Sequence, residues 1–140
     1  MSALNDQVRA FLATAPLAHV VTLDPDGGPQ VSVVWVSVDG DEIVSGHMYD
    51  NRKLRNVRRD PRVAISFQPG EIPPGTFLAD YLVVHGTGRV TEGGAGELLR
   101  RLGKAYVAPD FDFPLPPDAG PGWILRVHVD RVVGHGPWKD

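Results

Sequence analysis

The first third of the chain alternates between apolar and polar stretches with the spacing of short strands. Apolar, β-branched runs occupy residues 17–23, 29–38 and 42–48, and turns rich in Asp, Gly and Pro separate them. Runs of this kind bounded by such turns predict strands joined as hairpins. We therefore predict a three-stranded antiparallel meander in this part of the chain.

Three further strands are predicted in the second part of the chain, at residues 63–68, 80–91 and 123–133. Gly86 and Gly88 lie inside the middle one and indicate a bulge or a close backbone approach. Six short strands with few helices favour a small, closed or nearly closed antiparallel barrel. The expected fold class is mainly β with short helices (α+β).

Helical spacing of apolar residues predicts three short helices. The first precedes Pro16 and has Ser2 or Asn5 available as its N-cap, and the others span residues 50–59 and 94–106. Each of them carries its apolar residues on one face, as expected of a helix that packs against a sheet.

The segment 107–122 contains five prolines and is predicted to be irregular. It also carries Phe111, Phe113 and Leu115. These apolar side chains are interpreted either as a lid over a ligand or as anchors that hold a long connection to the barrel.

The strand at 29–38 is apolar on both faces, which is unusual for a strand of a small sheet. Alternation places Val31, Val33 and Trp35 on one face and leaves the other face to Val34, Val36 and Val38. A strand with one solvated face would be polar at every second position. One face is therefore expected to pack in the barrel and the other against a partner subunit.

Composition narrows the class of protein. The chain has 140 residues, of which 42% are hydrophobic and 22% charged, and no linker separates two parts, so we expect a single domain over residues 1–140. A net charge of −3 gives no reason to expect nucleic acid or an anionic membrane as a partner. No signal peptide is expected, and no apolar run approaches the ~20 residues that span a bilayer. The chain has no cysteine, which excludes disulfides and cysteine-based metal sites and fits a cytoplasmic protein.

Positive charge is concentrated on the second predicted helix. Six of the fourteen Lys and Arg residues fall within residues 52–62, directly after the third strand: Arg52, Lys53, Arg55, Arg58, Arg59 and Arg62. Unsatisfied N–H groups at a helix start, together with Arg and Lys in its first turn, suit a phosphate group. The alternative interpretation is a solvated basic face.

Other chemistry finds less support in the sequence. The five histidines lie at spacings that match no metal-ligand motif, and no nucleophile motif is present, so no metal and no catalytic protein residue are predicted. His47 is of interest because it ends the strand before the basic helix, although it could simply be a half-buried strand residue. Trp35 in a strand interior is more often a core residue than a site residue.

Three segments carry a resemblance to a known family: Asp26–Val36, Asn51–Val63 and Tyr81–Val90. Together they resemble the pyridoxamine 5′-phosphate oxidase-like split β-barrel family, and most closely its flavin/deazaflavin oxidoreductases that use coenzyme F420. The resemblance implies a six-stranded antiparallel split β-barrel. It also implies a homodimer with the cofactor in two grooves between the subunits.

The resemblance further implies which residues contact the cofactor. Arg52 and Lys53 would hold its phosphate, Gly46 and His47 would contact it from the end of the preceding strand, and the second strand would lie along its ring. Trp138 could stack near a ring in the partner's groove or cover the end of the barrel. The full set of expected cofactor contacts is Ser32, Val33, Trp35, Gly46, His47, Asn51, Arg52, Lys53, Asn56 and Trp138. Gly46 departs from the family pattern, because many relatives carry a Ser or Thr hydroxyl at this position.

The function implied by the resemblance is that of a cytoplasmic, coenzyme F420-dependent reductase. It would transfer a hydride from the reduced deazaflavin to a small organic acceptor, and the cofactor rather than a protein acid or base would carry the chemistry. Two alternatives are an FMN-dependent reductase or oxidase of the same fold and a non-catalytic protein that binds a cofactor, haem or another tetrapyrrole. Nucleic acid and membrane are not expected as partners.

Overall fold

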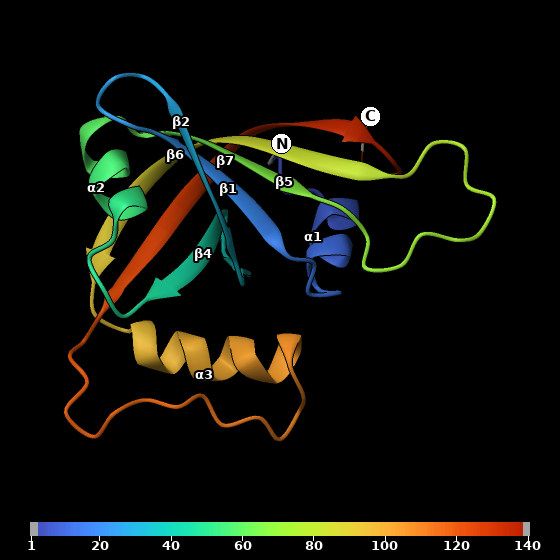
Figure 1. The fold of residues 1–140 in the computed structure, drawn as a ribbon. Coiled ribbons are helices and arrows are strands. Elements are labelled where there is room, and N and C mark those ends of the chain that lie inside the picture. Colours follow the sequence, from blue (N-terminus) through green and yellow to red (C-terminus); the bar gives the residue numbers. More distant parts are fainter. Residues whose placement is uncertain (1–2, 139–140) are drawn as a thin grey trace.

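The computed structural model describes residues 3–138. Figure 1 shows a strongly bent sheet with α2 near one end, α1 near the other, and α3 with the segment 107–122 below it. The predicted class, mainly β with short helices in an antiparallel split barrel, is confirmed, and the sheet is not closed. The elements in chain order are α1 (Asp6–Leu12), β1 (Ala18–Leu23), β2 (Pro29–Val34), β3 (Ser37–Asp39), β4 (Glu42–His47), α2 (Arg52–Arg59), β5 (Arg62–Phe67), β6 (Tyr81–Glu92), α3 (Ala95–Tyr106) and β7 (Trp123–His135).

The two longest strands join the two halves of the sheet. The strand order is β2-β1-β5-β6-β7-β4-β3, and every neighbouring pair is antiparallel. The ribbon of β6 and β7 is bent at a register shift between His85 and Gly86, where the sequence predicts a bulge. A Cβ on Gly86 would lie 2.4 Å from the carbonyl oxygen of His128, so only glycine allows this close approach.

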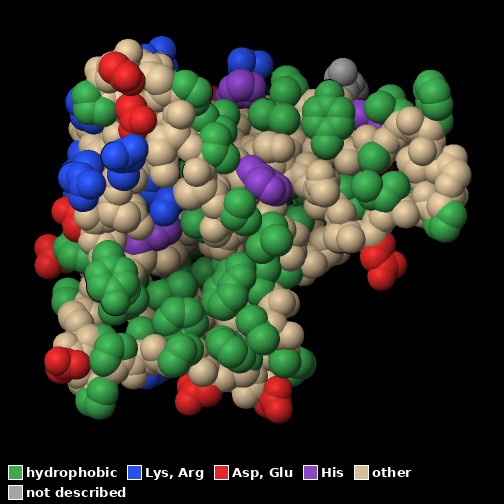
Figure 2. Space-filling view, viewed as in Figure 1, with side chains coloured by type: hydrophobic (Ala, Val, Ile, Leu, Met, Phe, Trp, Pro, Cys, Tyr) green, Lys and Arg blue, Asp and Glu red, His purple; other side chains and the backbone are tan. Residues whose placement is uncertain are grey.

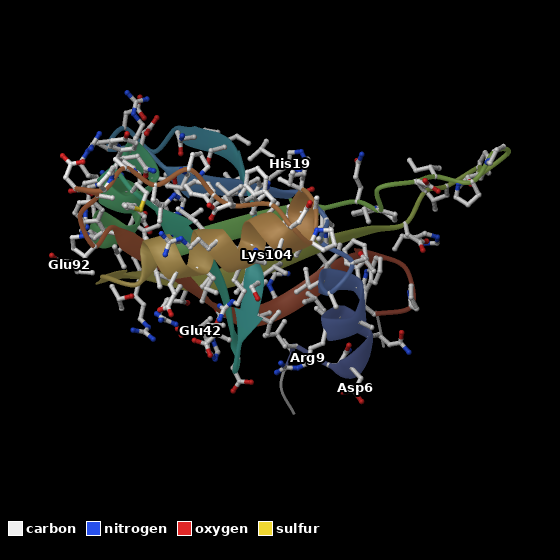
Figure 3. All side chains as sticks on the ribbon, turned by 90° about the horizontal axis from the view of Figure 1, so that it is seen from below. Asp6, Arg9, His19, Glu42, Glu92 and Lys104 are labelled. Atoms are coloured by element: carbon white, nitrogen blue, oxygen red, sulfur yellow. The ribbon has the colours of Figure 1, made fainter. Side chains whose placement is uncertain are left out.

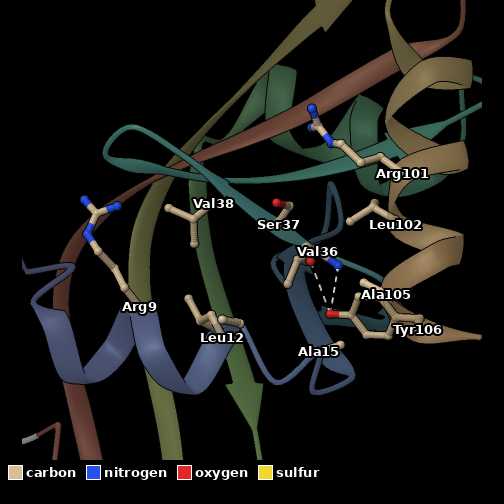
Figure 4. Close-up of a pocket in the computed structure, with 11 residues that line it drawn as sticks. Arg9, Leu12, Ala15, Val36, Ser37, Val38, Arg101, Leu102, Ala105 and Tyr106 are labelled. Atoms are coloured by element: carbon tan, nitrogen blue, oxygen red, sulfur yellow. Dashed lines mark hydrogen bonds between the residues drawn. The ribbon is translucent and has the colours of Figure 1, made fainter. Parts of the chain in front are cut away.

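The sheet has seven strands rather than the predicted six, because the continuous strand expected at 29–38 is broken. β2 pairs with β1, whereas β3 pairs with β4 on the other side of the barrel. At the break, the Tyr106 hydroxyl accepts a hydrogen bond from the Val36 N–H (3.1 Å) and donates toward the Pro16 carbonyl (2.7 Å), with the Val36 carbonyl at 3.2 Å. Figure 4 shows the hydroxyl against the Val36 backbone. A side chain of α3 thus takes the place of a strand partner at the split.

The interior is divided between the barrel and the contact with α3. Along β4, Ile43 is buried in the barrel, whereas Val44 points the other way and packs with Leu98 and Leu102 of α3. Along β7, Ile124 joins the same contact. Both faces of these strands are covered, which is why their sequences are apolar at consecutive positions.

The ends of the helices follow the predicted signals. Asn5 is the N-cap of α1, with its side chain accepting from the Val8 N–H at 2.9 Å, whereas Ser2, the other candidate, lies outside the described residues. Asn51 caps α2, and Gly94 in the left-handed conformation precedes α3. Among residues 3–138 we find no helix with the length and apolar character needed to cross a membrane.

On the outward face of the half-sheet β2-β1-β5-β6, two cross-strand rows contain no Lys, Arg, Asp or Glu. One row consists of Val33, His19, Ser66 and Val83, and the next row consists of Val31, Val21, Ala64 and His85. Val31 and Val33 are 58% and 53% exposed. Figure 2 shows hydrophobic and histidine side chains together over this region, and Figure 3 shows His19 on the opposite side of the molecule from Arg9 and Glu42.

Removal of the Tyr106 hydroxyl should destabilise the barrel at its split. In Tyr106→Phe, the buried Val36 N–H loses its partner, and we expect the free energy of unfolding to fall by about 1–3 kcal/mol in urea titrations. Tyr81→Phe is the control, because the Tyr81 side chain is 44% exposed. Equal, small effects of both changes would contradict the role assigned to Tyr106.

Candidate functional site

Most of the basic cluster on α2 is exposed and already bonded to protein acceptors. Arg52 has a 65% exposed side chain 3.9 Å from the Asp24 carboxylate, and Arg58 is paired with Asp50 at 2.6 Å. Arg62, on β5, is paired with Asp60 at 2.7 Å. The two remaining arginines donate to backbone carbonyls, Arg55 to Asp50 and Arg59 to Leu23. These five arginines fit the solvated-face interpretation.

Lys53 differs from the rest of the cluster because it lies on the inward face of α2. Its neighbours on that face are Leu54, Asn56 and Val57, and Lys53 itself is 8% exposed. Within residues 3–138, it has no hydrogen-bond or ion-pair partner. Burial lowers the pKa of its ammonium group. A buried cation without a counter-ion is costly for the fold and is suited to bind an anion.

His47, at the end of β4, is held in its neutral form beside Lys53. Asn51 uses its Oδ1 to cap α2 at the Leu54 N–H, so its Nδ2 donor faces His47 Nδ1 at 3.5 Å. This network assigns the ring proton to Nε2, which donates to Ser45 Oγ at 2.8 Å. Burial, and secondly the charge of Lys53, lower the pKa of His47 to about 4.

A cavity of about 450 Å³ opens beside this network. One wall is formed by the end of β4 and the turn that follows, from Gly46 to Tyr49, with Asn51. The opposite wall comes from the irregular segment, with Phe113, Leu115 and their proline neighbours, and from Leu99 of α3. The volume and mixed lining suit a ring-bearing small molecule.

Segment 107–122 is anchored to α3, and part of it lines the cavity. Phe111 packs closely over Gly103, where a Cβ would lie 2.6 Å from its ring, and thereby anchors the segment to α3. Phe113 and Leu115 are half-buried and line the cavity. Phe113 also makes an edge contact with Trp35 at 6.1 Å between ring centroids.

Gly46 has a packing role that its place in the sequence does not reveal. Its neighbours alternate, so Ser45 and His47 face inward while Gly46 faces α3. A Cβ on Gly46 would lie 3.1 Å from both the Ala95 carbonyl oxygen and Leu99 Cγ. The absence of a hydroxyl here follows from the close approach of α3.

Three of the ten predicted contacts line the cavity, namely Gly46, His47 and Asn51, and a fourth, Lys53, lies near His47. Arg52 points to the outer face of α2. Asn56 is buried and donates to Thr22 Oγ1 and the Asp24 carboxylate, so it fixes α2 to β1. Ser32 and Val33 point to opposite faces of β2; the Ser32 hydroxyl is buried without a hydrogen-bond partner within residues 3–138.

The two predicted tryptophans lie elsewhere. Trp138 is 4% exposed, packs against Phe11 and donates through Nε1 to the Tyr81 carbonyl, so it covers the end of the barrel. Trp35 stacks on Tyr106 at 5.7 Å and reaches the cavity only through Phe113.

Ser45 and the cavity residues of segment 107–122 were not predicted as site residues. The period of two along β4 places Ser45 and His47 on one face, and this signal could have identified Ser45. No local signal could have placed Phe113 opposite His47, because the two positions are brought together by the packing of α3.

Comparison with known proteins identifies the family of the chain. The family model of pyridoxamine 5′-phosphate oxidase matches residues 4–136. The chain belongs to the pyridoxamine 5′-phosphate oxidase family. No curated protein sequence matches it. A solved structure described as an F420 reductase shares 26% identity with it, with a TM-score of 0.72 over 89% of this chain and 94% of that one.

Two further solved structures share the family fold at lower identity. A conserved hypothetical protein of Mycobacterium tuberculosis has a TM-score of 0.69 at 22% identity, covering 96% of this chain and 84% of that one. A heme binding protein of Mycobacterium smegmatis has a TM-score of 0.65 at 20% identity, covering 94% of this chain and 53% of that one. The family and the F420 reductase support an oxidoreductase, flavin-binding type of fold.

The buried neutral His47 should make the stability of the protein depend on pH. Its folded pKa of about 4 lies below the ordinary 6.5, so the unfolded chain binds the proton first as the pH falls. The stabilisation is fully present above pH 6.5 and is lost between pH 6.5 and 4. We expect a loss of about 2 kcal/mol between pH 7 and pH 5 in urea titrations. In His47→Gln this loss should be absent, and an unchanged profile in that variant would contradict the assignment.

Proposed function

We propose that this protein is a coenzyme F420-dependent oxidoreductase that reduces a small organic acceptor and binds its cofactor at the interface of a homodimer. The observation that carries the proposal is the buried ammonium of Lys53, which has no partner among the described residues and lies near His47, a residue that lines a cavity of about 450 Å³. The family match and the F420 reductase neighbour support the same class of cofactor.

The residues present fit a cofactor that has a phosphate and a ring. Lys53 offers a cation without a counter-ion, and the Ser32 hydroxyl is a buried polar group without a partner in the described part of the chain. Phe113 and Leu115 offer apolar surface on the wall facing His47. When bound, the reduced deazaflavin would supply the hydride.

The chain itself would bind the cofactor, orient it and exclude water from it. Lys53 would bind the phosphate, and Asn51 would fix the start of α2 through its cap at Leu54. His47 stays neutral and donates to Ser45, which keeps its ring in one orientation at the cavity wall. The anchored segment 107–122 would cover one side of the ligand and limit the access of water.

Two other functions are compatible with the same fold. An FMN-dependent reductase or oxidase would use the same cavity. A haem carrier finds less support, although a heme binding protein shares the fold. A haem iron commonly takes a histidine ligand, and His47, the one histidine on this wall within residues 3–138, has both ring nitrogens engaged in hydrogen bonds.

The phosphate role of Lys53 is tested by titration of coenzyme F420 and of FMN into the protein. Lys53→Ala removes a charge-assisted hydrogen bond worth about 1.5–3 kcal/mol, so the dissociation constant should rise roughly ten- to a hundredfold. Arg58→Ala is the charge-matched control, because Arg58 is exposed and paired with Asp50. Its effect should be small and should fade with added salt. Equal losses in both variants would show a diffuse positive field instead of a site.

The homodimer should use the outward face of β2-β1-β5-β6, whose two cross-strand rows contain no Lys, Arg, Asp or Glu. Its two cross-strand rows expose Val31 and Val33, and the cavity wall at His47 would be completed by a second copy. Sedimentation should therefore give about twice the 15.2 kDa mass of the chain.

A charge on this face should separate the subunits. Val33→Asp places a carboxylate where the partner would pack and should give monomers with weaker cofactor binding, whereas Gln7→Asp on the exposed side of α1 should leave the dimer intact. A wild-type monomer that binds the cofactor with full affinity would contradict the interface proposal.

A further inference from the structure

The charge available at the Lys53 site is a single positive unit. The four arginines of α2 already have protein partners. Arg52 lies beside Asp24, and Arg58 is paired with Asp50. Arg55 and Arg59 donate to backbone carbonyls. All four are exposed, whereas Lys53 is buried and has no partner among the described residues. Among the described residues of one chain, an anion at this site therefore meets one unpaired cation.

His47 cannot add a second positive charge without breaking the start of α2. A protonated ring would carry a hydrogen on Nδ1, which faces the Nδ2 donor of Asn51 at 3.5 Å. Asn51 cannot turn its oxygen toward the ring, because Oδ1 caps the Leu54 N–H. The charged group that acts on His47 is Lys53 from α2, which also opposes protonation, and the remaining contact, Ser45, is neutral.

Phosphate esters differ in the charge that they bring to such a site. A phosphodiester carries one negative charge at every pH of interest, whereas a phosphomonoester carries about −1.5 to −2 near pH 7, with a second pKa of about 6. One cation can neutralise the diester. The second charge of a monoester would be buried without a partner, which is costly.

We propose that this site selects a singly charged phosphodiester over a doubly charged phosphomonoester. The proposal rests on the proposed function and deepens it, because coenzyme F420 carries its phosphate as a diester and FMN carries it as a monoester. The charge balance at Lys53 would thereby distinguish the two cofactors independently of their rings.

The test uses three deazariboflavin probes that share one ring: the free alcohol, its 5′-phosphate and the methyl ester of that phosphate. Each is titrated into the wild-type protein at several values between about pH 5.5 and pH 8, and binding is followed by ring fluorescence. The methyl diester should bind with the same affinity throughout. The affinity for the monoester should fall as its second proton leaves. Relative to the diester, the fall should reach up to about tenfold at pH 7 and about a hundredfold at pH 8. Near pH 5.5 the two should bind alike.

Two variants distinguish the charge of Lys53 from the general attraction of a positive surface for an anion. In Lys53→Gln, all three probes should bind within a few-fold of one another, whereas Arg58→Gln should retain the order seen in the wild type. Tighter or equal binding of the monoester at pH 8 would overturn the charge selection and leave the proposed function standing. If not even the free alcohol binds, the ring site itself is wrong, and both proposals fall together.

Discussion

A buried ammonium with no counter-ion among the described residues is the constraint around which the site is organised. Lys53 sits on the inward face of α2, where an apolar side chain would stabilise the protein more. The helix is held in this orientation by Asn51, which caps its start, and by Asn56, which donates to Thr22 and Asp24 of β1 and the turn after it. The two asparagines thus hold α2 in the orientation that buries Lys53 near His47.

The helix that closes the split in the barrel, α3, also forms one side of the cavity. The chain leaves β2 at Trp35 and Val36 and crosses to β3, and Tyr106 satisfies the Val36 N–H that has no strand partner there. The same residue fixes the end of α3, whose outer side carries the segment 107–122 over the cavity. Gly46 allows α3 to approach β4 closely. Fold and cavity therefore depend on the same few contacts.

Much of the fold could be predicted from periodicity and turns, because those signals are local. The break at Val36 could not be predicted, since it depends on Tyr106, seventy positions away in sequence. Within the site, the sequence identifies the basic helix and predicts that Arg52 and Lys53 act as a pair, whereas the helix places them on different faces. The apolar neighbours of Lys53 in the sequence, Leu54 and Val57, are the signal that distinguishes it from Arg52. Phe113 and His47 lie on facing walls of the cavity because of tertiary packing alone.

The state of the Lys53 ammonium can be measured directly, because the chain has three lysines and its NMR signals are few. Carbon-13 labelling of the lysine ε-carbons, with Lys53 assigned by comparison with Lys53→Arg, gives its titration curve in the free protein and with coenzyme F420 added. The account predicts a pKa for Lys53 below its ordinary value in the free protein, because burial disfavours the charge, and an increase when the anionic ligand binds. An ordinary pKa that does not change on ligand addition would contradict it.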